Sequence, residues 1–176
     1  MSPSVHEAPA AAPVDVVVEV EAAAWAAEPA AETVVRRAIA AAASLARVAP
    51  TARGEVSVVL TDDAAIRALN REWRDIDKPT NVLSFPARAS SGRPASTPLV
   101  LLGDIVIAYQ TTAREAAAEE KPFAHHLAHL AVHGFLHLIG YDHDSDREAD
   151  AMEQLEATIL ARLGVPDPYL TRAAGA

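Results

Sequence analysis

The chain contains no cysteine among its 176 residues. Disulfide bonds and thiolate ligands are therefore both excluded, and any transition-metal site must use histidine, with or without carboxylates. The absence of cysteine also fits a reducing compartment, and we expect a cytoplasmic protein.

Charged residues are missing from residues 122–141, a stretch that is about long enough to cross a bilayer. Its content argues against a membrane span, because five histidines would be costly in contact with lipid. A buried helix that carries a metal needs such a mixture of apolar residues and histidines. We therefore expect a core helix and no membrane partner. The five histidines are His125, His126, His129, His133 and His137.

Positive charge is missing at the N-terminus ahead of any apolar run, so residues 1–13 do not resemble a secretory signal. Their alanine and proline content predicts a disordered N-terminal tail, and residues 166–176 predict a C-terminal tail. The remaining residues, 14–165, are enough for one domain with a hydrophobic core and too few for two without a clear linker. We expect a single domain.

The apolar periodicity predicts an α+β fold in which a small mixed sheet of about four strands packs on helices. Thr61 is expected to cap the second helix, because two acids follow it. A loop rich in Ser, Gly and Pro is expected at 89–98. Strands are expected at 14–20, 55–60, 81–85 and 99–108, and helices at 30–48, 62–73, 109–119, after Pro122 and at 146–163.

Three histidines follow the spacing H-x3-H-x5-H. His133 and His137 are four residues apart, so they share one face of a helix and can direct their ring nitrogens at a single ion. Gly140 can adopt a positive φ, end that helix and turn the chain back so that His143 approaches the same ion. Three neutral imidazoles leave an open fourth position on a tetrahedral zinc, which is typical of a catalytic site with a bound water. We predict one Zn2+ per chain, on a central helix and the loop that follows it.

Gly134 distinguishes this pattern from that of a large class of proteases. The spacing matches the H-x-x-x-H-x-x-G-x-x-H skeleton of metzincins, in which a glutamate directly after the first histidine is the general base. Here glycine occupies that position, which counts against peptide hydrolysis. A carboxylate beside the nucleophile would repel an anionic phosphodiester, whereas zinc and a nearby arginine could stabilise its transition state.

The charge of the chain is unevenly distributed. The formal net charge of −9 argues by itself against a polyanionic partner. Residues 67–93, however, carry six basic residues and three acidic ones. This segment could give the expected zinc site an anionic substrate.

Three segments resemble the YbeY family of bacterial endoribonucleases, the rRNA maturation factors. They are HGFLHLIGYDH at 133–143, DKPTNVLSFP at 77–86 and LGDIVI at 102–107, and the resemblance extends over about residues 14–169. It implies a cytoplasmic, zinc-dependent enzyme that cuts single-stranded RNA, acts in maturation of the 3′ end of the small-subunit rRNA and takes part in ribosome quality control. The expected partners are that rRNA and, since the chain is acidic, ribosomal proteins that help to target it.

The resemblance also assigns residues. It implies that His133, His137 and His143 bind zinc and that Arg74, in the context W-R-x-x-D-K-P-T, lies across the cleft and contacts an RNA phosphate. The zinc is expected to activate a water or to polarise the phosphate.

Several alternatives stay open. Asp142 and Asp144 flank the third ligand and either replace the missing base, orient imidazoles, remain solvated in the loop or cap a helix. The attacking group is either a ribose 2′-OH or water. His129 is expected to be a packed histidine, and Phe85 and Tyr141 to be core residues.

The competing functions are a metal-dependent hydrolase of peptides or small molecules and a non-catalytic ribosome-assembly factor with structural zinc.

Overall fold

The computed structural model describes residues 14–46, 53–87 and 99–170, so the expected tail at 1–13 and loop at 89–98 lie outside the described residues. The predicted strands and helices are found within a few residues of their expected bounds, and a short 3-10 helix, η1, was not predicted. The elements are β1 (Val14–Val20), η1 (Ala23–Ala27), α1 (Ala31–Leu45), β2 (Arg53–Thr61), α2 (Asp63–Arg74), β3 (Val82–Pro86), β4 (Leu99–Ala108), α3 (Tyr109–Ala118), α4 (Phe123–Leu138) and α5 (Asp146–Arg162).

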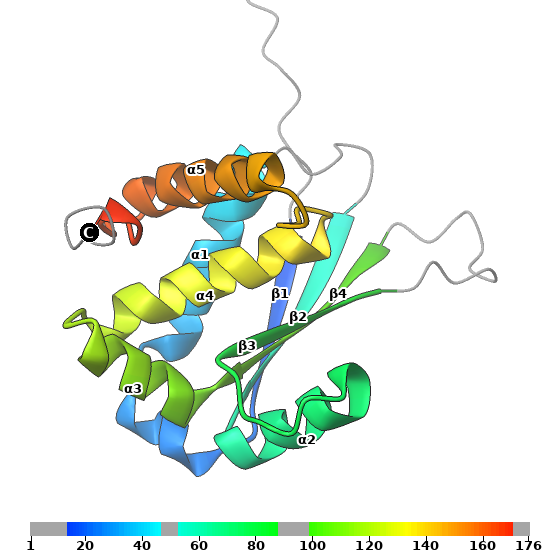
Figure 1. Ribbon diagram of the computed structural model, residues 1–176, viewed down its shortest axis with the longest axis vertical. Helices are drawn as coiled ribbons and strands as arrows, with labels where there is room; N and C mark the ends of the chain where they lie inside the picture. The colour runs from blue at the N-terminus through cyan, green and yellow to red at the C-terminus, as the bar shows by residue number, and fades with distance from the viewer. Residues whose placement is uncertain (1–13, 47–52, 88–98, 171–176) are drawn as a thin grey trace, which may run out of the picture.

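The four strands form one mixed sheet in the order β1-β2-β4-β3. β1, β2 and β4 are parallel to one another, while β3 runs antiparallel to β4. The predicted α+β fold with a mixed sheet of four strands is thereby confirmed. β3 forms one edge of the sheet and contacts α4, the helix that carries the histidines (Figure 1).

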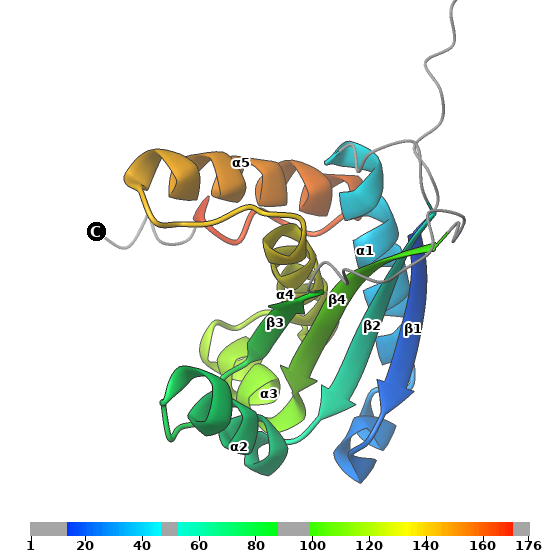
Figure 2. The ribbon, with the colours of Figure 1, turned by 90° about the vertical axis from the view of Figure 1, so that its right-hand side faces the viewer.

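Helices cover both faces of the sheet, and β4 shows how the sequence directs them. Ile105 and Ile107 belong to the core cluster with α1 and α4, whereas Val106 and Ala108 pack with Ile66 of α2. Successive residues therefore point to opposite faces, and both faces are buried. Figure 2 shows the sheet with α2 on the near side and α1 and α4 on the far side.

α4 is the central helix of the fold. It is largely buried and contacts α1, α3, α5, β3 and β4. The stretch without charged residues therefore forms a core helix. In the described part of the chain, no helix combines the length and the apolar character that crossing a bilayer requires.

The cap of α2 differs from the prediction. Asp62, and not Thr61, is the N-cap, because its carboxylate accepts a hydrogen bond from the Ala65 amide at 2.8 Å. Thr61 instead pairs with Ala108 as the last residue of β2. The prediction of Thr61 as the cap was wrong because it could not include this strand pairing.

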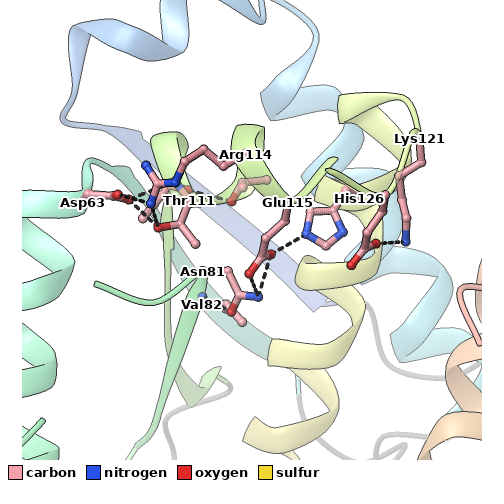
Figure 3. A network of polar contacts seen from close by, with 11 residues as sticks. Asp63, Asn81, Val82, Thr111, Arg114, Glu115, Lys121 and His126 are labelled. Atoms are coloured by element: carbon pink, nitrogen blue, oxygen red, sulfur yellow. Dashed lines mark hydrogen bonds and ion pairs between the residues drawn. The ribbon is translucent and has the colours of Figure 1, made fainter. Parts of the chain in front are cut away.

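Asp63 connects the start of α2 to α3 (Figure 3). Its carboxylate accepts hydrogen bonds from the Thr111 amide and hydroxyl at 3.0 and 2.7 Å, and pairs with Arg114 at 2.8 Å. Burial raises the pKa of the Asp63 carboxyl, but the hydrogen bonds from Arg114 and Thr111 outweigh it and hold the pKa below its ordinary value. The ionised carboxylate therefore stabilises the folded protein.

We expect Asp63→Ala to lower the free energy of unfolding by about 1–3 kcal/mol at neutral pH, because it leaves donors of α3 unpaired. Since the folded pKa lies below the unfolded value of about 3.9, this stabilisation is present above roughly pH 4 and is lost as the pH falls through the folded pKa. Denaturant unfolding of both proteins at pH 7 and at low pH measures the difference. Glu72→Ala, which removes an exposed acid from the same helix, is the control. A difference that stays constant down to the lowest pH would contradict the assignment.

Candidate metal centre

His133 and His137 lie one turn apart on α4, and their ring centroids are 4.6 Å apart. Their Nε2 atoms face each other at 3.1 Å. Both side chains are partly buried. The helix therefore presents two ring nitrogens at one place, as the four-residue spacing predicts.

The turn after α4 has the hydrogen bonds of a Schellman motif. The Gly140 amide donates to the His137 carbonyl at 3.2 Å, and the Tyr141 amide donates to the Leu136 carbonyl at 3.0 Å. Gly140 has a φ of 103°, in the region that favours glycine. The prediction that Gly140 ends the helix and turns the chain is confirmed.

His143 returns to the two histidines of the helix. Its Nε2 lies 2.8 Å from the Nε2 of His137, and the two rings stack. One ring nitrogen from each of the three residues lies within 4.8 Å of the other two. Asp142 shapes the loop, because its carboxylate accepts a hydrogen bond from the His143 amide at 2.8 Å. The structure thus brings the three expected ligands together.

The donor set fits a metal ion. A tetrahedral zinc with nitrogen ligands at 2.0–2.1 Å separates those nitrogens by roughly 3.3 Å, which is close to the 2.8 and 3.1 Å found here. Burial, followed by the charges of His133 and His143, lowers the pKa of His137. A neutral imidazole is the form that binds metal. The three-histidine group can therefore hold a metal ion.

Glu156 of α5 lies behind these ligands, and the sequence reasoning missed it. The residue is fully buried, and its Oε1 lies 2.6 Å from Nδ1 of His133. Burial raises the pKa of the Glu156 carboxyl, but hydrogen bonds from His129 and His133 outweigh it and lower the pKa to about 2. Its place in the buried stripe with Met152 and Ile159 is the sequence signal that could have found it, since an acid in an apolar stripe needs a partner.

His129 is more than the packed histidine that we expected. Its Nε2 lies 3.0 Å from Oε2 of Glu156 and 3.2 Å from the Tyr169 hydroxyl. Tyr169 belongs to the expected C-terminal tail, of which the structure describes residues 166–170. The start of that segment therefore contacts the side chains behind the three histidines.

The three histidines line a cleft of about 820 Å³. Residues 80–86, which include β3, line it between α4 and the end of α2 (Figure 1). Trp73 and Arg74, the last two residues of α2, line the same cleft. The structure thus brings Arg74 into one cleft with the three histidines.

The backbone at the end of α2 is held by the loop that follows it. Asp75 adopts the left-handed conformation, with a φ of 58°, and ends the helix directly after Arg74. The buried Asn70 donates a hydrogen bond from its side-chain amide to the Lys78 carbonyl at 2.9 Å. The cleft side chains of α2 therefore project from a backbone with defined geometry.

Gly134 lies where α4 packs against the sheet. A Cβ at this position would be 3.0 Å from Cγ2 of Ile105 and 3.1 Å from Oγ of Ser84. The Ser84 hydroxyl also donates a hydrogen bond to the Gly134 carbonyl at 2.9 Å. The position at which metzincins carry their glutamate therefore faces the sheet, where a side chain would have to displace Ile105 and Ser84.

Further polar and aromatic side chains complete the lining. Asp142 and Asp144 line the cleft beside His143 and are exposed. A hydrogen bond from the His143 amide lowers the pKa of Asp142. Phe85 and Tyr141 pack against the core clusters, as expected, and also line the cleft.

A family model described as Endoribonuclease YbeY matches residues 18–164. The chain belongs to the YbeY family. The resemblance seen in its three sequence segments is thus confirmed, and with it the expectation of a hydrolase that cuts RNA internally. The matched span contains the three histidines, Arg74 and Glu156.

Individual YbeY proteins match most of the chain. Endoribonuclease YbeY of Rhodopseudomonas palustris (strain BisB18) is 63% identical over 145 residues, which cover 82% of this chain and 86% of that protein. Endoribonuclease YbeY of Bradyrhizobium diazoefficiens is 59% identical over 150 residues, covering 84% and 81%. A solution structure of a protein from Thermotoga maritima is 21% identical, covers 85% of this chain and 91% of that one, and superposes with a TM-score of 0.45.

We expect His137→Ala to abolish tight metal binding, because His137 faces both other histidines. The affinity for zinc should fall by more than about 100-fold, the upper range for loss of a supporting residue alone. Competition with a chromophoric chelator and elemental analysis measure this. His125→Ala, on the same helix but outside the three-histidine group, is the control. Retention of stoichiometric, tightly bound metal by a folded His137→Ala protein would refute the site.

Proposed function

We propose that this protein is a zinc-dependent endoribonuclease specific for single-stranded RNA. We propose further that it acts in the cytoplasm, in maturation of the 3′ end of the small-subunit rRNA and in ribosome quality control. The observation that carries the proposal is the convergence of three histidines in a cleft that Arg74 also lines. Membership of the YbeY family supports RNA as the substrate.

Zinc is the proposed metal, because three imidazoles without a thiolate suit an open zinc site. His133 and His137 would hold it from α4, and His143 from the loop. When bound, zinc supplies a Lewis acid and lowers the pKa of a water towards 7.

Arg74 is proposed to bind the phosphate of the RNA. Its side chain is exposed and lines the cleft. A guanidinium can donate to two phosphate oxygens at once and offset the charge that develops on them during cleavage. Arg67, on the same helix, instead pairs with Asp77 at 2.9 Å. Of these two arginines, Arg74 therefore supplies positive charge to the cleft, and Arg67 does not.

Trp73 supports the preference for single-stranded RNA. Its side chain is 59% exposed, although large apolar rings are normally buried, and it lines the cleft beside Arg74. The ring of Phe85 meets it edge-on, with centroids 6.0 Å apart. An unpaired base can stack on such a ring, whereas a base within a duplex is already stacked.

The competing functions are less well supported. Peptide hydrolysis of the metzincin type needs a glutamate at position 134, where this chain has a glycine that packs closely against Ile105 and Ser84. A structural zinc site has four protein ligands, whereas this three-histidine group opens into a cleft. Asp142 and Asp144, which line the cleft, are the candidates for the proton acceptor, and the attacking group is either a 2′-OH or water.

RNA cleavage should depend on the metal. The purified protein, with zinc verified, should cut a single-stranded oligoribonucleotide, stop when a strong chelator removes the metal, and recover when zinc is returned. A duplex of the same sequence should resist cleavage. Degradation of unstructured peptides with RNA left intact would favour the peptidase alternative.

Arg74→Glu should lower cleavage by a factor of about 100 or more, because it replaces an anion-binding group with a repelling one. Zinc content should not change, since Arg74 is not a ligand. Arg71→Glu, which introduces the same charge change one turn earlier on α2, is the control. In cells, full maturation of the rRNA 3′ end with folded His137→Ala and Arg74→Glu proteins would instead identify an assembly factor that does not use this site for cleavage.

Trp73→Ala should weaken binding of single-stranded RNA by roughly 1–3 kcal/mol, the value of one base stacked on an aromatic ring. Trp73→Phe should restore most of the affinity. Intrinsic fluorescence offers a direct measurement, because the second tryptophan, Trp25, is only 3% exposed. RNA should therefore quench the tryptophan fluorescence of the parent protein and leave the fluorescence of the Trp73→Phe protein almost unchanged. Equal affinity of the Ala and Phe variants would exclude stacking.

A further inference from the structure

A buried carboxylate connects three side chains behind the metal centre. Glu156 lies 2.6 Å from Nδ1 of His133 through Oε1 and 3.0 Å from Nε2 of His129 through Oε2. The Tyr169 hydroxyl donates a hydrogen bond to the same Oε2. The side chain of Glu156 is only 1% exposed. One carboxylate of α5 thus receives contacts from two residues of α4 and from the segment after α5.

These contacts assign the protons of both imidazoles. A carboxylate can only accept, so His133 carries its proton on Nδ1 and keeps the lone pair of Nε2. That Nε2 faces His137, in the three-histidine group. His129 likewise donates from Nε2 to the carboxylate, and its buried Nδ1 has no hydrogen-bond partner among the described residues.

The geometry points to Glu156 as the positioning residue of the metal centre. It locks His133 in the tautomer and orientation that present Nε2 to the metal, and His129 and Tyr169 hold the carboxylate in place. The inference rests on the proposed zinc site and extends it from the ligands to the residues that hold them. Carboxylates that accept the other N–H of a ligating histidine raise its basicity and fix its ring.

The three donors also explain how a carboxylate can be buried at this position. An isolated carboxylate in the core would be strongly unfavourable, and hydrogen bonds to each oxygen reduce that cost. His133 supplies the hydrogen bond to Oε1, and His129 and Tyr169, which lie outside the three-histidine group, supply those to Oε2. Their role is therefore to keep Glu156 ionised and oriented towards His133.

A second metal ion in this cluster is the alternative explanation. His129, His133 and Glu156 also lie close enough together to hold one. His133 would then have to bind two ions through its two nitrogens and lose both protons. Hydrogen bonds from the ring N–H groups of His129 and His133 to Glu156 explain the same short distances without that cost. We therefore favour the hydrogen-bonded network.

Glu156→Gln is the decisive variant, because the amide keeps the size of the side chain but cannot accept from all three donors. We expect the dissociation constant for zinc to rise about 10–100-fold. The substitution should also change His133 from the pure Nδ1–H tautomer to a mixture of tautomers, which 15N NMR of the metal-free protein would detect. Glu153→Gln, an exposed residue of the same helix, is the matched control and should change neither.

Tyr169→Phe keeps the test valid if Glu156→Gln fails to fold. It removes one donor to the carboxylate, and we expect a smaller rise in the dissociation constant, of several-fold. A folded Glu156→Gln protein with parental zinc affinity, or a Tyr169→Phe protein with parental zinc affinity, would overturn the inference, and so would two tightly bound zinc ions per chain. None of these measurements uses RNA, so a failure of the proposed nuclease function would leave the result on Glu156 unaffected.

Discussion

The close approach of α4 to β3 and β4 is the constraint on which the rest of the structure depends. Residue 134 has no side chain, and Ile105 and Ser84 lie only 3.0 and 3.1 Å from the point where a Cβ would stand. The approach sets β3 between the histidines and the end of α2, and so produces a single cleft from parts distant in sequence. A methyl group at position 134 would require these neighbours to shift by a few tenths of an ångström, and a longer side chain would disturb the contact of α4 with β3 and β4 further.

The convergence of the three histidines could be predicted from the sequence because their geometry is local. The helical repeat sets the distance between His133 and His137, and a glycine with positive φ returns His143 within a few residues. β4 was also predictable from local sequence, since a strand buried on both faces consists largely of apolar residues. Arg74 needed the family resemblance, because charge and spacing alone do not distinguish it from other arginines on the surface.

The residues that were missed depend on contacts between distant elements. Glu156 meets His133 only because α5 docks beside α4, and on α5 it is one of several acids. The local sequence is compatible with Thr61 as the N-cap of α2, and only the pairing of Thr61 with Ala108 of β4 shows that it belongs to β2. A tryptophan is usually at least partly buried, and only the fold reveals that the side chain of Trp73 is exposed. In each case the local pattern was compatible with more than one tertiary environment.

The Schellman turn at Gly140 divides the metal ligands into two kinds. His133 and His137 are partly buried on a helix that the core holds in place, whereas His143 is exposed on the loop beyond the turn. A bound ion would be held by two imidazoles on the rigid helix and by one on the loop. A movement of the loop alone would remove one of the three imidazoles from the group and would not require the helix to unfold. The rate of metal exchange should thus be set by movement of a short surface loop, and not by the global stability of the protein.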